Sequence, residues 1–72
     1  MKKIIIQTEY IALGQFLKLA EIIQSGGEAK WFLSENEIVI NGEIDNRRGR
    51  KLRNNDQIKI NGFGSFIVKN ES

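Results

Sequence analysis

The densest cluster of chemically capable side chains in this sequence is the basic segment, residues 47–53, with the sequence Arg-Arg-Gly-Arg-Lys-Leu-Arg. It holds five of the chain's eleven Lys and Arg residues and no acid: Arg47, Arg48, Arg50, Lys51 and Arg53. Five like charges in so short a segment repel one another, and an anionic partner relieves that repulsion. Mixed charges would serve solubility better. The pattern therefore favours phosphate binding over a merely solvated loop.

The charge of the basic segment differs in sign from that of the rest of the chain. The formal net charge is +2, so removing the segment's +5 leaves −3 for all other residues. If each of the five cations neutralises one phosphate, log affinity should fall with log salt at a slope of about −3.5 to −4.5, at about −0.7 to −0.9 per phosphate. A basic loop does not by itself distinguish RNA from DNA.

Several kinds of chemistry are excluded by composition. The chain has no Cys and no His, which removes disulfides, thiolate nucleophiles, the usual ligands of zinc, haem and iron–sulfur clusters, and the commonest general base. The nine acidic residues are scattered, and there is no glycine-rich phosphate signature. We expect neither an enzyme nor a protein with a cofactor or metal.

The length and the N-terminal residues indicate one domain, residues 1–72, in the cytoplasm. A chain of 72 residues lies near the lower limit for a self-sufficient core. The opening MKKIII stops being apolar at Gln7, short of the roughly 7 to 15 apolar residues of a signal peptide. No apolar stretch approaches the roughly 20 residues that cross a bilayer.

Two helices are predicted beside the basic segment, after a first strand at about residues 3–7. A helical apolar face runs from about residue 12 to Gln24: Leu13, Phe16, Leu17, Ala20 and Ile23. Residues 25–27, Ser-Gly-Gly, should end this helix, and Ser25 or Gly27 should cap a second helix over 28–35 that closes at Asn36 in a left-handed conformation. The short linker predicts a helical hairpin or a helix-turn-helix-like corner.

The remaining chain has the period of two that is typical of strands. Asn41-Gly42 predicts a type I′ hairpin, a polar turn at 54–56 leads into a strand at 57–60, and Asn61-Gly62 leads into a strand at 65–69. Gly49 should let the basic segment turn sharply, and Leu52 should anchor it in the core. The order predicts an α+β fold: a two-helix hairpin packed on a small, mostly antiparallel sheet of short strands.

The chain resembles the RNA-binding domain first seen in the small-subunit ribosomal protein S-four, the alpha-L motif. The resemblance covers about residues 13–62 and rests on these matches: Phe16-Leu17-Lys18, Gly27-Glu28-Ala29-Lys30, Ile38-Val39-Ile40-Asn41-Gly42, Arg48-Gly49, Lys51-Leu52 and Asp56. The added N-terminal strand makes it similar to the small stand-alone bacterial members, the YaaA-like group. The resemblance implies a non-catalytic monomer that binds structured RNA, ribosomal RNA first and tRNA second, with the large ribosomal subunit as a further expected partner.

In this family the helical pair forms one wall of the RNA surface, which implies roles for Lys18 and Lys30 and for the segment Ser25, Gly26 and Gly27. Free amides at the start of a helix can hold a phosphate, although the Glu28 carboxylate can cap them instead. Two basic contacts common in the family are missing, because Leu13-Gly14-Gln15 is uncharged and no Arg accompanies Ser25. More of the binding should then fall on the basic segment.

Two features leave alternatives open. Trp31 should lie off the buried stripe of its helix, where it either packs on the N-terminal strand or last hairpin, or offers a surface on which a base stacks. The acids Glu35, Glu37, Glu43 and Asp45 would instead serve a protein-binding adaptor, whose basic segment meets an acidic partner. DNA binding is a third possibility.

Overall fold

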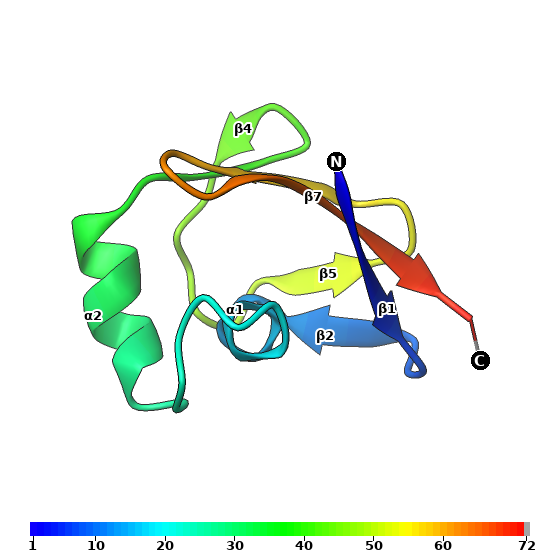
Figure 1. The fold of residues 1–72 in the computed structure, drawn as a ribbon, viewed down its shortest axis with the longest axis horizontal. Coiled ribbons are helices and arrows are strands. Elements are labelled where there is room, and N and C mark those ends of the chain that lie inside the picture. Colours follow the sequence, from blue (N-terminus) through cyan, green and yellow to red (C-terminus); the bar gives the residue numbers. More distant parts are fainter. Residues whose placement is uncertain (72) are drawn as a thin grey trace.

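A five-stranded sheet forms one layer of the protein in a computed structural model that describes residues 1–71. Its spatial order is β1 (Lys2–Ile6), β7 (Gly64–Asn70), β6 (Gln57–Ile60), β3 (Ile38–Ile40) and β4 (Glu43–Ile44). Strand β1 runs parallel to β7, and every other neighbouring pair in this sheet is antiparallel. Figure 1 shows both helices on the same side of the sheet. The predicted α+β fold with a mostly antiparallel sheet is confirmed.

A second, two-stranded ribbon lies beneath the large sheet and was not predicted. It pairs β2 (Tyr10–Ala12) with β5 (Lys51–Arg53) in antiparallel register. The second half of the basic segment is therefore a strand rather than a loop. Its residues alternate, with Leu52 fully buried between two exposed cations. Leu52 is an anchor in the core, as predicted.

The first helix, α1 (Leu13–Leu19), is shorter than predicted. The apolar pattern extended it to Gln24, but Glu21 adopts a left-handed φ of 62° and the helix unwinds before it. The amides of Ile22 and Ile23 both donate to the Leu17 carbonyl at 2.9 and 3.3 Å, which satisfies the end of the helix. Ile23 is nevertheless buried after this turn. The apolar spacing therefore predicted correctly that Ile23 is buried, but it predicted too long a helix.

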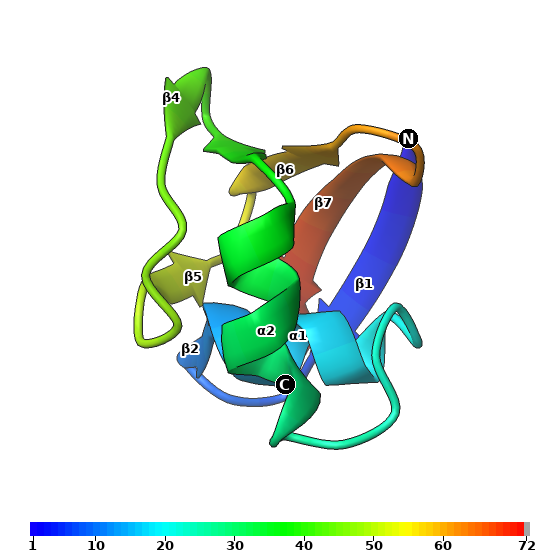
Figure 2. The same cartoon turned by 90° about the vertical axis from the view of Figure 1, so that its left-hand side faces the viewer.

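The second helix, α2 (Glu28–Glu35), has the predicted bounds. Its predicted left-handed cap is wrong, because Asn36 is extended, with φ −134° and ψ 138°. The Asn36 side chain closes the helix instead, by donating from Nδ2 to the Phe32 carbonyl at 3.0 Å. Helix α2 is steeply inclined to α1 (Figures 1 and 2), so the two helices form a corner.

The Asn41-Gly42 hairpin turn follows its sequence signal, whereas at Asn61-Gly62 only Gly62 has a positive φ, of 89°. Asn41 and Gly42 have φ of 50° and 85°, the two positive values that a type I′ turn requires. The Asn41 side chain also ties its hairpin to the next turn, because Oδ1 accepts from the Gln57 amide at 2.9 Å and Nδ2 donates to Asp56 Oδ1 at 3.0 Å. Strand β6 begins at Gln57, as predicted.

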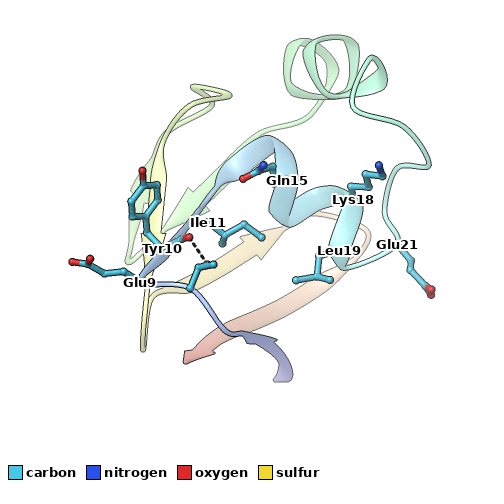
Figure 3. A pocket seen from close by; sticks show the side chains of 8 residues that line it. Glu9, Tyr10, Ile11, Gln15, Lys18, Leu19 and Glu21 are labelled. Carbon is cyan, nitrogen blue, oxygen red and sulfur yellow. Dashed lines mark hydrogen bonds between the residues drawn. The ribbon is translucent and has the colours of Figure 1, made fainter. Parts of the chain in front are cut away.

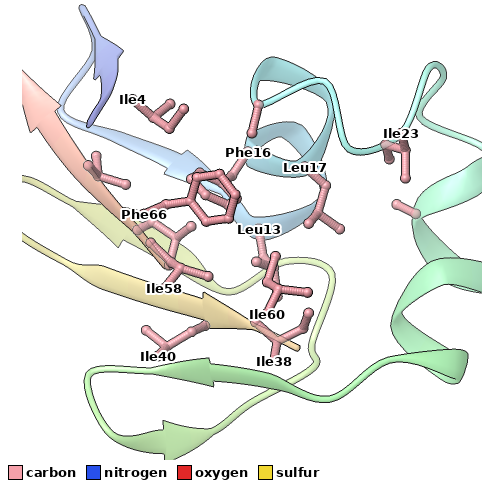
Figure 4. Close-up of a cluster of buried hydrophobic side chains, with 14 of the residues drawn as sticks. Ile4, Leu13, Phe16, Leu17, Ile23, Ile38, Ile40, Ile58, Ile60 and Phe66 are labelled. Carbon is pink, nitrogen blue, oxygen red and sulfur yellow. The ribbon is translucent and has the colours of Figure 1, made fainter. Parts of the chain in front are cut away.

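The core fills the space between α1 and the sheet (Figure 4). Leu13, Phe16 and Leu17 of α1 are fully buried against the inner face of the sheet, where Phe66 meets Phe16 edge to face at 5.7 Å between ring centroids. Side chains alternate along the strands, so Lys3 and Lys59 lie on the opposite face. Within residues 1–71, no helix is long and apolar enough to cross a membrane. Because Leu13, Phe16 and Leu17 are buried, the core holds the start of α1 in place next to the basic segment.

Candidate nucleic-acid interface

The basic segment is fastened to the start of α1 by its own backbone. The amide of Leu13 donates to the Arg50 carbonyl at 2.8 Å, and the amide of Gly14 donates to the Arg48 carbonyl at 3.0 Å. The first amides of a helix have no partner within the helix. Here the basic segment supplies the acceptors, so its cations are held at a fixed place beside α1.

Gly14 explains why the start of α1 carries no charged side chain at this position. It is buried, and a Cβ atom placed on it would lie 2.8 Å from Arg48 Cγ and 3.4 Å from Ala29 Cβ. The first distance is shorter than carbon atoms tolerate. The missing side chain leaves room for the stem of Arg48 to lie across α1.

Asp45 organises the first half of the basic segment. Its Oδ2 lies 2.7 Å from Arg47 Nη2 and 2.9 Å from Arg50 Nη1, and its Oδ1 accepts from the Arg47 backbone amide at 3.0 Å. Hydrogen bonds from the Arg47 side chain, and then from its backbone and from Arg50, hold the pKa of Asp45 far below its ordinary value, while Asp45 raises the pKa of Arg47. The carboxylate therefore stays ionised between its two arginines.

This arrangement changes the charge that the basic segment offers to a partner. The sequence suggested five unpaired cations, but one carboxylate is shared by Arg47 and Arg50, so residues 45–53 carry five positive charges and one negative, a net +4. The Arg50 side chain is only 29% exposed, whereas that of Arg47 is 73% exposed. The cations open to solvent are on Arg47, Arg48, Lys51 and Arg53.

Gly49 does not have the role expected of it. Its φ is not among the positive values, and the turn closes through a hydrogen bond of 3.1 Å from the Arg50 amide to the Arg47 carbonyl. A Cβ placed on Gly49 would meet nothing within 4 Å. Any L-residue fits this turn, so the chain itself gives no structural reason for the glycine.

Two concave surfaces meet at the basic segment. One, of about 510 Å³, lies between α1, the interhelical linker and the basic segment; its lining comprises Ala12, Gly14, Gln15, Lys18, Gly26, Ala29, Arg48 and Gly49. We call this the arginine groove. The other, of about 660 Å³, lies along the segment itself and is lined by Arg47, Gly49, Arg50, Lys51, Arg53 and Asp56. The structure thus brings Lys18, Gly26 and Arg48 together from three separate stretches of chain.

The remaining residues expected at the helical wall lie apart from the arginine groove. Lys30 is exposed on α2 but does not line the groove. At the start of α2, Glu28 Oε1 accepts from the Gln24 amide at 3.3 Å and from the Ser25 hydroxyl at 3.4 Å, and the Glu28 amide donates to the Ser25 carbonyl. Gly27 is the N-cap, without a side-chain cap. The chain's own carboxylate therefore competes with any phosphate at this helix terminus.

Three large aromatic side chains are exposed: Trp31, Phe63 and Tyr10. Trp31 is 64% exposed, so packing on the N-terminal strand or the last hairpin is wrong. Phe63 is half exposed and meets Phe32 edge to face at 5.6 Å. The Tyr10 ring centroid lies 4.9 Å from Lys51 Nζ and 5.4 Å from Arg53 Cζ. Only the β2–β5 pairing reveals this contact.

Comparison with known proteins places this geometry in a family. The model of the S4 domain matches residues 4–69. The chain belongs to the S4 domain family. It is also 68% identical over 65 residues to the probable ribosome maturation protein RlbA of Bacillus subtilis (strain 168), an alignment that covers 90% of this chain and 92% of that protein. No solved structure matches. The resemblance stated from the sequence, including the likeness to small bacterial members, is confirmed.

Proposed function

We propose that the protein binds structured RNA without catalysing a reaction, that ribosomal RNA is its main target, and that it acts in ribosome maturation. The S4 domain match supports RNA as the ligand, and the printed name of the Bacillus relative supports the ribosomal role. A monomer acting in the cytoplasm, in contact with the large subunit, is the simplest form of this proposal.

The observation that carries the proposal is the arginine groove, where Arg48 of the basic segment and Lys18 of α1 face one concave surface. Backbone hydrogen bonds from Leu13 and Gly14 hold the two parts together, so little ordering is needed when RNA binds. A-form RNA hides its major groove and exposes phosphates and 2′-hydroxyls along a shallow minor groove. A rigid cationic concavity suits that shape better than it suits a particular sequence.

The test compares two double variants that remove the same charge. Arg48→Gln with Lys51→Gln alters the basic segment, whereas Lys3→Gln with Lys59→Gln alters exposed lysines on the far face of the sheet. Against a ribosomal RNA fragment, the first pair should make the salt slope shallower by about 1.4 to 1.8, at about 0.7 to 0.9 per phosphate. The second pair should change it little. Equal effects of both pairs would show only general charge attraction and would refute this binding surface.

The choice of Arg48 and Lys51 follows from the geometry of Asp45. Reversing Arg47 or Arg50 to Glu would place a second carboxylate beside Asp45 and disrupt the segment, so lost binding would have two explanations. The same pairing weakens the adaptor alternative, because Asp45 is engaged by its own chain. If the Arg48 and Lys51 variant keeps its association with purified ribosomal subunits, the RNA proposal fails.

A further inference from the structure

Another concave surface, of about 850 Å³, lies between the β1–β2 turn and the outer side of α1 (Figure 3). We propose that this second groove, here named the tyrosine groove, receives one unpaired nucleobase of the bound RNA, stacked on Tyr10. The inference rests on the proposed function, because it concerns the same RNA. It adds a contact to a base, where the basic segment offers contacts to phosphates.

The interior of the tyrosine groove is suited to a flat, uncharged group. Ile11 and Leu19 point into it, and Leu19 is 49% exposed although it is a large apolar side chain (Figure 3). Tyr10 forms one end and is 42% exposed. Tyr10 and Ile11 are neighbours on β2 and point to opposite faces of the strand, so the Tyr10 ring lies beside the apolar interior rather than within it. A nucleobase has two apolar faces and polar edges, so it can stack on the Tyr10 ring at this end of the groove while its edges remain hydrated.

The charges around the groove favour a base over a phosphate in its interior. The carboxylates of Glu9 and Glu21 line opposite ends and point away from the middle, which disfavours an anion there (Figure 3). The cations lie at the rim instead. Lys18 stands on α1 and, like Gln15, lines both this groove and the arginine groove, so the two grooves are neighbours.

At the Tyr10 end of the groove, the cations of Lys51 and Arg53 are placed where they can bind the phosphates on either side of a stacked base. Tyr10 lies opposite Arg53 and Ala12 lies opposite Lys51 in the β2–β5 ribbon, so Tyr10, Lys51 and Arg53 share one face. Both cations lie within cation–π distance of the ring, at 4.9 and 5.4 Å. An incoming base can displace the flexible Lys51 ammonium from the ring, which leaves that charge beside the sugar–phosphate backbone.

The tyrosine groove is also held in place before any ligand arrives. The Thr8 hydroxyl donates to the Tyr10 carbonyl at 2.8 Å and closes the turn before β2, and the ribbon pairing fixes the Tyr10 backbone. Preorganisation of this kind reduces the entropy lost on binding. These three features, an apolar interior, a cationic rim and a fixed ring, distinguish Tyr10 from Trp31, which is more exposed and is not part of this groove.

The experiment uses two RNA hairpins that differ by one unpaired base in the stem, with each binding curve measured at the same salt concentration. The wild-type protein should bind the hairpin with the unpaired base more tightly, and Tyr10→Thr should reduce that preference by about 5- to 150-fold, the range measured for stacking of one base on an aromatic ring. Tyr10→Phe is the matched control and should keep the preference, because it keeps the ring. The salt slope should stay nearly unchanged in both.

Other outcomes separate this inference from the proposed function. If the wild type binds both hairpins equally with the expected salt slope, or if Tyr10→Phe loses the preference as fully as Tyr10→Thr, stacking is refuted while RNA binding stands. If the wild type binds neither, the proposed function fails first. Circular dichroism checks folding, and should Tyr10→Thr unfold, Tyr10→Leu replaces it with the same expected loss, because it keeps an apolar side chain but has no ring. Weaker binding of Tyr10→Thr to intact ribosomal subunits but not to their naked RNA would assign the groove to a protein and overturn the inference.

Discussion

Replacing Asp45 by Asn tests how the basic segment is organised. The carboxylate binds Arg47 and Arg50 at 2.7 and 2.9 Å, and an amide of the same shape keeps an acceptor oxygen but loses the charge. Two consequences follow that can be measured separately. The protein should become less stable, and its RNA binding should become more sensitive to salt.

The loss of stability comes mainly from Arg50. Its side chain is 29% exposed and Asp45 is 11% exposed, so their hydrogen bond is shielded from solvent, whereas Arg47 is 73% exposed and contributes little. A hydrogen bond to a charged group contributes about 1.5 to 3 kcal/mol, and Asn retains part of it, so we expect a loss of about 1.5 kcal/mol. For a domain of this size, that lowers Tm by roughly 6 to 12 °C.

The salt dependence should change in the opposite sense to that produced by removing a cation. With a net charge of +4 over residues 45–53, the wild-type segment should contribute a slope of log affinity against log salt of about −2.8 to −3.6. Asp45→Asn raises the net charge to +5, which should make this slope steeper, at about −3.5 to −4.5. The steeper value equals the one suggested by the sequence alone, because the variant has the five uncompensated cations that the sequence implied.

The assay is a series of dissociation constants for a ribosomal RNA fragment between about 50 and 400 mM salt, accompanied by thermal unfolding. Glu43→Gln is the matched control. It removes the same charge two residues away, but Glu43 is exposed on β4 and takes part in no ion pair within residues 1–71. A slope that stays constant or becomes shallower in Asp45→Asn, or an equal steepening in Glu43→Gln, would refute the reasoning.

Three further predictions concern acid, the buried glycine and the exposed glycine. The lowered pKa of Asp45 favours the folded state at neutral pH, and this contribution should decline as pH falls below the ordinary value of 3.8, so Tm should drop more between pH 6 and 3 in the wild type than in Asp45→Asn. Gly14→Ala should displace Arg48 and weaken RNA binding by about tenfold, while Tm changes little because improved helix propensity of about 1 kcal/mol offsets the clash. Gly49→Ala should leave Tm unchanged or raise it slightly, because a Cβ atom at this position meets no other atom. Gly49 lines both concave surfaces at the basic segment, so if RNA passes close to its backbone, the affinity of Gly49→Ala for RNA should fall. An unaltered affinity would refute that path of the RNA.

The sequence predicted best those elements that local chemistry determines. Asn41-Gly42 fixes a type I′ turn because few other pairs accept two positive φ values, and the bounds of α2 follow from the glycines before it and the extended chain after it. The end of α1 was mispredicted because Glu21 adopts a left-handed conformation without any Gly or Asn to signal it.

What the sequence did not predict at the site depends on contacts between distant residues. Tyr10 and Arg53 are partners across a ribbon whose strands are separated by both helices and the first hairpin, and no short-range pattern indicates that pairing. Asp45 is close in sequence to Arg47, but a neighbouring acid is compatible with an ion pair or with two solvated charges. Only the position of the segment on α1 decides between them.

The parallel pairing of β1 with β7 has a consequence for the order of events during synthesis. Lys2 pairs with Phe66 and Ile6 with Asn70, so the first strand made is completed by one that emerges more than sixty residues later. Until residue 70 has left the ribosome, β1 cannot complete its pairing with β7, and β7 is its one neighbour in the sheet. Pairings of such long range slow folding. Strand β1 therefore remains without its partner while residues 7–63, the segment between the two strands, are synthesised.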